Sequence, residues 1–217
     1  NIKNEYIFHK FKYNGYGKKY AYNKDILFAE SIVNFYQNLV NKDIKDHKKI
    51  KLLALCEDLA IEGGNIINDG RCLIMNKNPL KMHNSLSWSK IYSILVKSFK
   101  RNNIEQYYTI DVDGLIGDDT DGHIDNLVRI NNDKLLYMSI HDIHHPNYTR
   151  TKDLKIQLEE IINESNNFNE LIPIEHNSDD IVRNKEGNIL PFSYLNYIRV
   201  ADVVIIPTNK KTSDEKK

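Results

Sequence analysis

The sequence has few of the features that mark disulfide-stabilised, metal-bound or membrane-inserted proteins. Its 217 residues include only two cysteines, Cys56 and Cys72, which form neither a Cys-x-x-Cys pair nor a zinc-ligand spacing. No stretch approaches 18 apolar residues, and no basic segment leads into a shorter apolar run, so neither a membrane span nor a secretory signal is predicted. Acidic and basic residues balance at 30 each, which disfavours a general binder of nucleic-acid backbones.

The remaining composition is that of one globular domain. Hydrophobic residues make up 41% of the sequence and charged residues 28%, which provides enough apolar material for a core. Cys56 and Cys72 both lie in apolar runs, so we expect buried structural thiols in a reducing cytoplasm. The alternative, a reactive nucleophile, would require exposure and neighbouring positive charge. Without a nucleic-acid or membrane signature, small molecules are the expected partners.

An acidic stretch at residues 118–126 is the most unusual part of the chain. It holds four carboxylates, one glycine and one imidazole: Asp118, Asp119, Asp121, Asp125, Gly122 and His123. Unpaired buried carboxylates cost roughly several kcal/mol each, so the stretch is either a solvated polar turn or a site that binds a cation and moves protons. If an extended strand follows Gly122, His123 and Asp125 point to the same face. Both interpretations stay open on these residues alone.

A second unusual stretch places one acid beside two glycines. Glu62 ends an apolar run that begins at Leu59, and Gly63 and Gly64 follow it directly. A glycine pair allows a backbone or a ligand to approach closely. A glutamate at this point is an unexpected choice for packing alone, which makes a functional role for Glu62 the better interpretation.

Hydrophobic patterning predicts an alternation of strands and helices. Strands are expected at residues 8–13, 50–55, 59–67, 72–75, 107–110, 127–130, 135–140, 171–174, 192–200 and 203–206, with a turn at 14–17. Helices are expected from Asp25, from Ser87 and over residues 152–163. Their predicted core faces are Ile26, Ala29, Ile32, Val33, Tyr36 and Leu39; Trp88, Ile91, Leu95 and Phe99; and Leu154, Leu158, Ile161 and Ile162. Helix starts separated by about 62 and 65 residues suggest one α/β unit used three times.

Two other polar stretches suggest metal ligands, but each has a competing explanation. His141, His144 and His145 fit a ligand spacing on one loop, whereas the following Pro146 indicates a turn into the third helix. Residues 111–114 begin like a calcium-binding loop. That interpretation fails, because an oxygen ligand is missing at the required position and no glutamate closes the loop.

Two motifs together resemble the agmatine deiminase family of guanidine-modifying enzymes. They are Glu62-Gly63-Gly64 and, after it, Asp118-Asp119-Thr120-x-Gly122-His123-x-Asp125. Residues 11–20 also look like the family's Asn-Gly/Trp-Gly segment, with tyrosine where tryptophan is usual, and residues 190–207 resemble its Pro-x-Ser-Tyr-x-Asn strand. The resemblance implies an α/β (α+β) pentein fold, a propeller of five ββαβ units, of which 217 residues would hold about three to four.

The resemblance also implies a chemistry. In such enzymes a cysteine thiolate attacks the guanidinium carbon, ammonia leaves with a proton from a histidine, and water then resolves the amidino-sulfur intermediate. His123 would be that acid and base, and Glu62 would orient it and stabilise its charge. Asp125 would bind the guanidinium. No metal and no organic cofactor is implied.

The remaining site residues are expected to shape the substrate-binding region. Asp118 and Asp119 would form the loop and add negative potential that attracts a cation. Gly63 and Gly64 would let the substrate approach the backbone closely. With His123, Glu62 and Asp125, these positions make up the predicted active site of residues 1–217.

Two parts of the family's active site are not found in the sequence. The family places a second guanidinium-binding aspartate upstream, in an Arg-Asp segment, and its nucleophilic cysteine near the C-terminus. The chain starts at Asn1, and Asp214-Glu215-Lys216 resembles the start of the family's next helix, although residues 209–217 also read as a free polar tail. We therefore expect one pentein catalytic domain that is incomplete at both ends and inactive alone.

The leading hypothesis is a cytoplasmic agmatine deiminase of putrescine biosynthesis, which converts agmatine to N-carbamoylputrescine and ammonia. A peptidyl-arginine or other guanidine deiminase would share Glu62, His123 and Asp125. A binding module that has lost catalysis, or a metalloprotein that uses the 141–145 histidines, are the alternatives. We expect no nucleic-acid or membrane partner, and the oligomeric state stays open, a homo-oligomer included.

Overall fold

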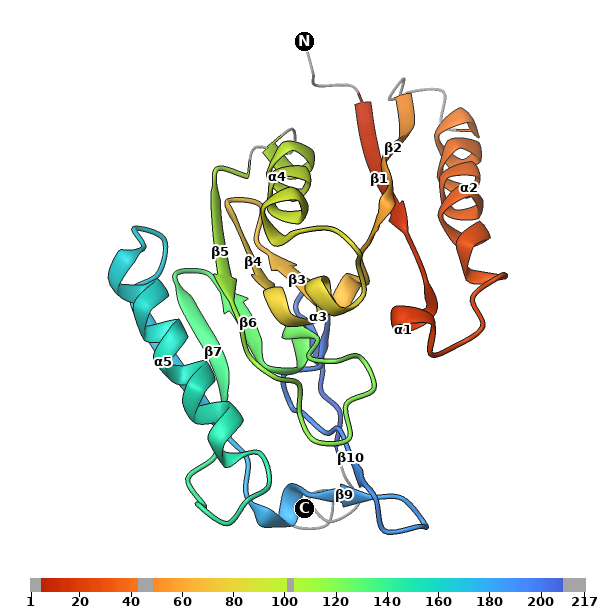
Figure 1. The fold of residues 1–217 in the computed structure, drawn as a ribbon. Coiled ribbons are helices and arrows are strands. Elements are labelled where there is room, and N and C mark those ends of the chain that lie inside the picture. Colours follow the sequence, from red (N-terminus) through yellow and green to blue (C-terminus); the bar gives the residue numbers. More distant parts are fainter. Residues whose placement is uncertain (1–4, 43–48, 101–103, 209–217) are drawn as a thin grey trace. The chain divides into compact units, whose positions relative to one another are not determined.

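The computed structural model describes residues 5–42, 49–100 and 104–208 (Figure 1). The chain forms two compact units. Unit 1 comprises Asn1–Glu62 and Leu80–Arg101, and unit 2 comprises Gly63–Pro79 and Asn102–Lys217. No helix in the described ranges has the length and apolar character needed to cross a membrane.

Unit 1 is built on a pair of parallel strands. Strand β1 (Glu5–Lys12) pairs with β2 (Lys49–Ala60), and helix α2 (Phe28–Lys42) connects them and packs against β2, as does α4 (Trp88–Phe99). The short elements α1 (Gly15–Lys18) and η1 (Asp25–Leu27) lie between β1 and α2, and α3 (Lys77–Met82) spans the boundary of the two units. The predicted turn at 14–17 is confirmed, since Gly15 and Gly17 have φ values of 65° and 69°.

Strand β2 joins two predicted strands and ends earlier than predicted. Residues 50–55 and 59–60 belong to one strand rather than two, because a bulge against β1 absorbs the polar residues that interrupt the apolar pattern. The strand predicted for 59–67 contains the start of a second strand, Ile66–Asn68, but it is interrupted after Ala60. There the side chain of Asn84 accepts from the Ala60 amide (2.7 Å) and donates to the Ala60 carbonyl (2.9 Å), so a side-chain amide replaces the neighbouring strand.

The predicted core face of α2 is only partly correct. Ala29, Ile32 and Val33 are half-buried, whereas Ile26, Tyr36 and Leu39 are exposed by 42–46%. The helix packs on a two-stranded sheet, which is too narrow to cover its full apolar arc. In α4 the prediction holds better, because Ile91, Leu95 and Phe99 are buried.

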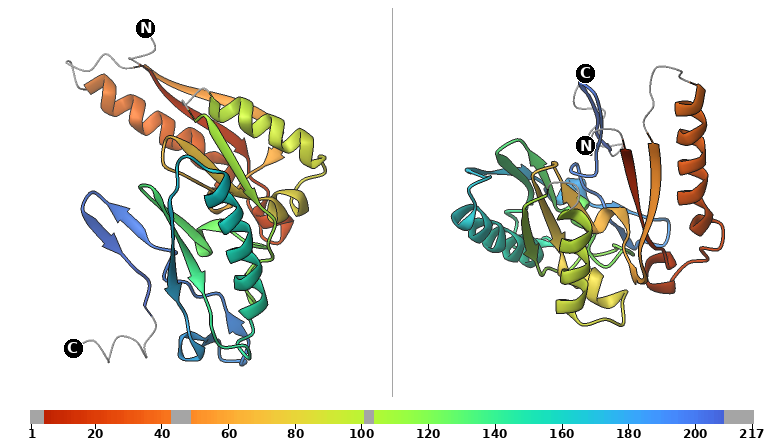
Figure 2. Two further views of the ribbon diagram at one scale, coloured as in Figure 1. Left: turned by 90° about the vertical axis from the view of Figure 1, so that its left-hand side faces the viewer. Right: turned by 90° about the horizontal axis from the view of Figure 1, so that it is seen from above.

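Unit 2 contains the two three-stranded sheets of the structure. One is β3 (Ile66–Asn68), β4 (Cys72–Asn76) and β5 (Gln106–Ile110), and the other is β6 (Val128–Asn131), β7 (Lys134–Ser139) and β8 (Glu170–Glu175). Helix α5 (Tyr148–Glu164) packs on β5, β7 and β8 (Figure 2). The smaller elements are η2 (Gly63–Asn65), η4 (Ile124–Asn126), η5 (Ser178–Asp180), β9 (Val182–Arg183), β10 (Ile189–Leu190), β11 (Ile198–Val200) and β12 (Val203–Ile205).

The strand order repeats along the chain. Strands β3 and β4 are antiparallel, α4 follows, and β5 pairs parallel to β4; β6, β7, α5 and β8 have the same pattern. Helices α2, α4 and α5 begin at Phe28, Trp88 and Tyr148, two intervals of 60 residues. The mixed α/β class is thus confirmed with a repeated ββαβ order, while closure into a propeller stays a prediction, as does a single catalytic domain.

The core of unit 2 lies between α5 and the sheets. Leu154, Leu158 and Ile161 of α5 are buried as predicted, and Ile162 packs at the edge of the same cluster. Helix α5 starts one turn earlier than the predicted residue 152. The apolar inner face agrees with the helical period, which shows that patterning located this helix correctly.

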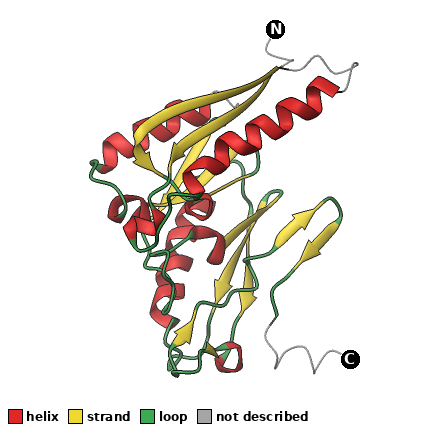
Figure 3. Cartoon of the chain, turned by 90° about the vertical axis from the view of Figure 1, so that its right-hand side faces the viewer, coloured by secondary structure: helices red, strands yellow, loops and turns green. Residues whose placement is uncertain are grey.

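The predicted strand at 192–200 is wrong for most of its length. Only Ile198–Val200 is a strand, paired with β12 in a hairpin (Figure 3), while residues 191–197 form an irregular turn. The physical reason lies in Ser193, whose hydroxyl accepts from the Leu195 amide (3.1 Å) and so competes with a strand ladder. The turn is nonetheless well anchored, because Ser193 and Leu195 are buried.

Two buried histidines bond to the backbone of loops in unit 2. His176 bonds the Ile174 carbonyl through Nδ1 (3.1 Å) and accepts from the Tyr194 amide at Nε2 (3.2 Å). His145 accepts from the Asn147 amide at Nδ1 (3.1 Å). In both rings one nitrogen faces a backbone N–H, so only the neutral imidazole fits. Burial lowers the pKa of both side chains, against the opposing effect of Asp180.

We predict that unit 2 loses stability in mild acid. Because the folded pKa of His145 and of His176 is lowered, the unfolded chain takes up protons first as the pH falls. Their contribution is therefore complete above about pH 6.5 and is lost progressively below it. Urea unfolding at pH 7.5 and pH 5.5 measures this loss. His176→Gln should reduce the pH dependence, and the exposed His144→Gln should leave it unchanged; an equal slope in both variants would contradict the assignment.

Candidate active site

The glycine pair and the acidic loop meet at Gly64, within unit 2. Gly64 is buried, and a Cβ placed on it would lie 2.2 Å from Nδ1 of His123 and 2.9 Å from Oδ1 of Asp125. Side-chain carbons do not approach other atoms that closely, so glycine is required here. Gly63 is exposed, and nothing lies within 4 Å of a Cβ placed on it. Of the predicted site residues, the structure thus brings together Gly64, His123 and Asp125.

His123 and Asp125 reach this place by a route that differs from the predicted one. The extended strand expected after Gly122 is wrong; His123 precedes the 3-10 turn η4, and Asp125 lies inside that turn. The sharp bend at Gly122 is present, with φ at 110°. His123 is 8% exposed, so its ring is held in the interior instead of on an open loop.

Asp118 forms the inner frame of the acidic loop. Its Oδ1 accepts from both the amide and the hydroxyl of Thr120, at 2.8 and 2.5 Å, and the Thr120 hydroxyl accepts from the His123 amide at 3.2 Å. The carboxylate is therefore connected to His123 through one side chain. Asp119, in contrast, is exposed. A shaping role for Asp118 agrees with this geometry, while substrate binding by Asp118 and Asp119 stays a prediction.

A buried asparagine holds the loop to the sheet. Asn76, fully buried at the end of β4, donates to the carbonyls of Val112 (2.9 Å) and Gly122 (2.8 Å) and accepts from the Val112 amide (3.2 Å). One side chain thus ties Val112, which precedes the acidic loop, and Gly122 within the loop to β4. Sequence patterning missed Asn76, because nothing local distinguishes it from a polar residue that ends a strand.

Asp125 is a carboxylate in a partly dehydrated position. Burial raises its pKa, the positive charges of His123 and Arg129 act in the opposite direction, and Asp118 adds to the increase. A carboxylate whose charge is costly in this way gains more than an exposed one when a cation binds. The chemistry of this position therefore suits a cationic ligand.

Glu62 has its own well-defined surroundings in unit 1. It is 4% exposed, and both carboxylate oxygens lie 3.1 Å from Nδ1 of His83. His83 is held in turn by Asn14, which donates to its carbonyl (3.0 Å), and by the close approach of Gly17 to its ring. Sequence reasoning missed His83. The prediction that Glu62 serves His123 stays a prediction.

Cys72 does not have the properties of a nucleophile. It is fully buried in β4, and burial, together with the neighbouring Asp69, raises its pKa to about 12. At neutral pH the reactive thiolate is therefore scarce. The prediction of a structural thiol is confirmed for Cys72, whereas the side chain of Cys56 lies outside the described part of the chain.

The histidines at 141–145 form a turn, as the following proline indicated. His145 is buried and bonds to Asn147, whereas His141 is exposed and lies 3.4 Å from Glu175. In the ranges that the structure describes, no group of three or more His, Cys, Asp or Glu residues is placed to hold a metal ion.

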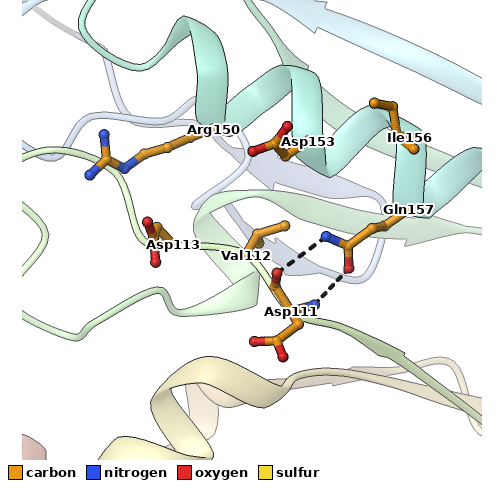
Figure 4. Close-up of a pocket in the computed structure, with 7 residues that line it drawn as sticks. All are labelled: Asp111, Val112, Asp113, Arg150, Asp153, Ile156 and Gln157. Carbon is orange, nitrogen blue, oxygen red and sulfur yellow. Dashed lines mark hydrogen bonds between the residues drawn. The ribbon is translucent and has the colours of Figure 1, made fainter.

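A pocket of about 290 Å³ lies elsewhere in unit 2, between residues 111–113 and α5 (Figure 4). Gln157 brackets the backbone of Asp111 there, accepting from its amide (2.7 Å) and donating to its carbonyl (3.2 Å). The Asp111 carboxylate pairs with Lys77 (3.1 Å), and that of Asp113 accepts from Asn78 (3.0 Å). These carboxylates thus serve separate partners, in agreement with the rejected calcium loop, and no predicted site residue lines the pocket.

The sequence as a whole decides the family. A model of the Porphyromonas-type peptidyl-arginine deiminase family matches residues 2–217. The chain belongs to this family. Members of this deiminase family are hydrolases that act on guanidino C–N bonds. No curated protein sequence gave a significant match.

Solved structures support the same family. A candidate peptidyl-arginine deiminase has 26% identity and a TM-score of 0.74, over 94% of this chain and 57% of its own. A serine-for-cysteine variant of C. jejuni agmatine deiminase with substrate bound has 21% identity and a TM-score of 0.71, over 95% of this chain and 56% of its own. Agmatine deiminase of Enterococcus faecalis has 19% identity and a TM-score of 0.68, over 92% of this chain and 57% of its own. The deiminase-family chain therefore spans little more than half the length of these structures, and its resemblance to the pentein agmatine deiminase-like group is confirmed.

We predict that the two neighbouring glycines respond differently to the same substitution. Gly64→Ala would place a carbon 2.2 Å from the His123 ring, so the side chains of His123 and Asp125 must move away from the backbone of residue 64. Gly63→Ala meets no atom within 4 Å. Thermal unfolding should show that the free energy of unfolding falls by about 1–3 kcal/mol for Gly64→Ala and by less than about 0.5 kcal/mol for Gly63→Ala. Equal effects would show that the backbone does not approach the site as described.

Proposed function

We propose that the chain is the guanidinium-binding part of an agmatine deiminase. The observation that carries the proposal is the placement of the Asp125 carboxylate and the His123 imidazole against the bare backbone of Gly64. A flat cation can approach such a backbone closely, and a carboxylate accepts its paired N–H groups. Two solved structures with a similar fold are agmatine deiminases by name. Cytoplasmic localisation and a role in putrescine formation are part of the same proposal.

The proposed reaction divides the roles among three side chains. Asp125 holds the guanidinium so that a thiolate can attack its carbon, and the C–N bond breaks as His123 gives a proton to the departing ammonia. His123 then takes a proton from water, which attacks the amidino carbon and releases the thiol and a ureido product. Glu62 would stabilise the charged imidazole. Its contact with His83 would fix the carboxylate for this task.

We propose that the nucleophile comes from outside residues 1–217. Cys72 is buried with a raised pKa, which removes the best-described internal candidate. A second aspartate that binds the substrate belongs to the same proposal. The activity and the substrate are both part of this proposal.

A peptidyl-arginine deiminase is the second candidate. It is favoured by the family description and by the structure with 26% identity, a candidate peptidyl-arginine deiminase. Both substrates present the same guanidinium, so Asp125 and His123 would serve either one. The difference lies in the rest of the substrate: a primary ammonium group in agmatine, and peptide groups in a protein-bound arginine.

Calorimetry with agmatine is the experiment that tests the proposal. We predict that the chain binds agmatine and that Asp125→Asn or His123→Ala weakens binding by about tenfold or more, because the first removes the carboxylate that holds the cation and the second removes a side chain that lines the same site. Agmatine and an arginine-containing peptide, compared in parallel, separate the two substrate candidates. If neither substitution changes the affinity for agmatine, the chain is a binding module without a guanidinium site at these residues.

Stability serves as the control for the same variants. The raised pKa of Asp125 means that its folded-state charge is disfavoured, so this carboxylate opposes folding above its unfolded pKa near 3.8. Asp125→Asn should therefore leave the melting temperature unchanged or higher while binding is lost. A large loss of stability would instead make Asp125 a structural residue.

Turnover by the chain alone gives a separate prediction. Residues 1–217 should release no ammonia from agmatine above the uncatalysed rate, because the only described thiol is buried and protonated. A sensitive ammonia assay on purified protein measures this. Turnover that disappears in Cys72→Ala would contradict both the assigned role of Cys72 and the need for an external nucleophile.

A further inference from the structure

The motif at residues 190–197 has no role in the chemistry described so far, although it lies behind the predicted site. Ser193 donates a hydrogen bond of 2.6 Å to the carbonyl of Asn126. Asn126 is the last residue of η4, the turn that contains Asp125. The carbonyls at the end of a helical turn lack partners within the turn, so the Ser193 hydroxyl caps one of them.

Arg129 makes the second connection between the motif and the site. Its Nε donates to the Leu195 carbonyl (2.7 Å) and its Nη2 to the Tyr197 carbonyl (3.2 Å), with the guanidinium 5.0 Å from the centre of the Tyr197 ring. One side chain thus holds two backbone carbonyls of residues 193–197. The same positive charge acts on Asp125 and opposes the effect of burial on its pKa.

Tyr194, next to Ser193, gives the segment two further bonds. The Tyr194 amide donates to Nε2 of His176 (3.2 Å), and the Tyr194 hydroxyl donates to Oδ1 of Asp180 (2.5 Å). Ser193 and Leu195 are 3% and 1% exposed, and Leu195 belongs to the hydrophobic core. The segment therefore connects the hydrophobic core to η4, because Leu195 packs in the core and Ser193 bonds to the last residue of the turn.

We propose that residues 193–197 are a positioning segment for the guanidinium site: Ser193 holds the η4 turn and thereby the Asp125 carboxylate, and Arg129 holds the segment in place. The inference rests on the proposed function, because it assigns these residues to the same site. Neither side chain is assigned a contact with the substrate. A carboxylate that must accept a bidentate hydrogen bond depends on its backbone being fixed to a fraction of an ångström, which a single capping bond can determine.

Hydrogen exchange of the turn tests the segment directly. The Asn126 and Leu127 amides donate to the carbonyls of His123 (3.3 Å) and Ile124 (2.9 Å), so they report on η4. We predict that Ser193→Ala speeds their exchange about tenfold, since the carbonyl of the half-buried Asn126 loses its partner. The β4 amides should keep their rates, because the sheet does not depend on this bond.

Ser178→Ala is the matched control. It also removes one serine hydroxyl that bonds a side chain or backbone oxygen, in this case Oδ2 of Asp142 (2.7 Å), but at an exposed site away from η4. The turn amides should exchange within about twofold of wild type in this variant. If Ser193→Ala and Ser178→Ala behave alike, the positioning role is overturned.

Agmatine binding adds the functional measurement. Ser193→Ala should raise the dissociation constant about tenfold with little change in melting temperature. Arg129→Lys, which keeps the charge but cannot span two carbonyls, should raise it similarly and serves if Ser193→Ala does not fold. Faster exchange with unchanged affinity would overturn the proposal. If wild type fails to bind agmatine, the proposed function fails, and the exchange comparison still decides whether the segment holds the turn.

Discussion

The close approach of two side chains to the backbone of Gly64 is the constraint on which the rest of the site depends. His123 and Asp125 occupy the space that any Cβ at this position would need. Such proximity persists only if the loop that carries both residues is held on all sides. Asn76 holds the loop to β4, Thr120 and Asp118 hold its inner curve, and Ser193 holds the end of η4. These bonds have the common effect of fixing one short turn.

The electrostatics of this turn agree with the proposed cationic ligand. Asp125 is partly dehydrated, and the positive charges near it do not cancel the effect of burial on its pKa. An isolated protein gains no stability from that arrangement. A bound guanidinium would supply the missing opposite charge together with paired hydrogen-bond donors. A raised carboxylate pKa of this kind is what the proposed guanidinium site requires.

Local patterns in the sequence predicted the elements that depend on local forces. Period and length located α4, α5, β4 and β7, because an amphipathic helix or a buried strand is recognisable from its own residues. The same approach failed at residues 192–200, where a serine hydroxyl competes with the strand ladder, and at β2, where a bulge interrupts the pattern. It also overestimated the core face of α2, because burial depends on the width of the sheet opposite and not on the helix alone.

The candidate site was predictable only in part for a similar reason. The glycine and carboxylate motifs include Gly64, His123 and Asp125, which the structure brings together, since unusual residue types in a short stretch are visible in the sequence. The expected strand geometry was wrong, because a 3-10 turn brings the two side chains to the same glycine. His83 and Asn76 were missed, and so was the contact of Ser193, since their partners are 21 to 67 residues away and no local pattern indicates such bonds.

A carbon-detected NMR titration of the Asp125 carboxyl group with agmatine tests the central claim most directly. The account predicts a saturable shift of the Asp125 carboxyl carbon and of the His123 ring, together with a fall in the pKa of Asp125, because a bound cation favours the ionised carboxylate. An Asp125 signal that ignores agmatine while other carboxylates respond, or an unchanged pKa at saturation, would contradict a guanidinium site at Gly64.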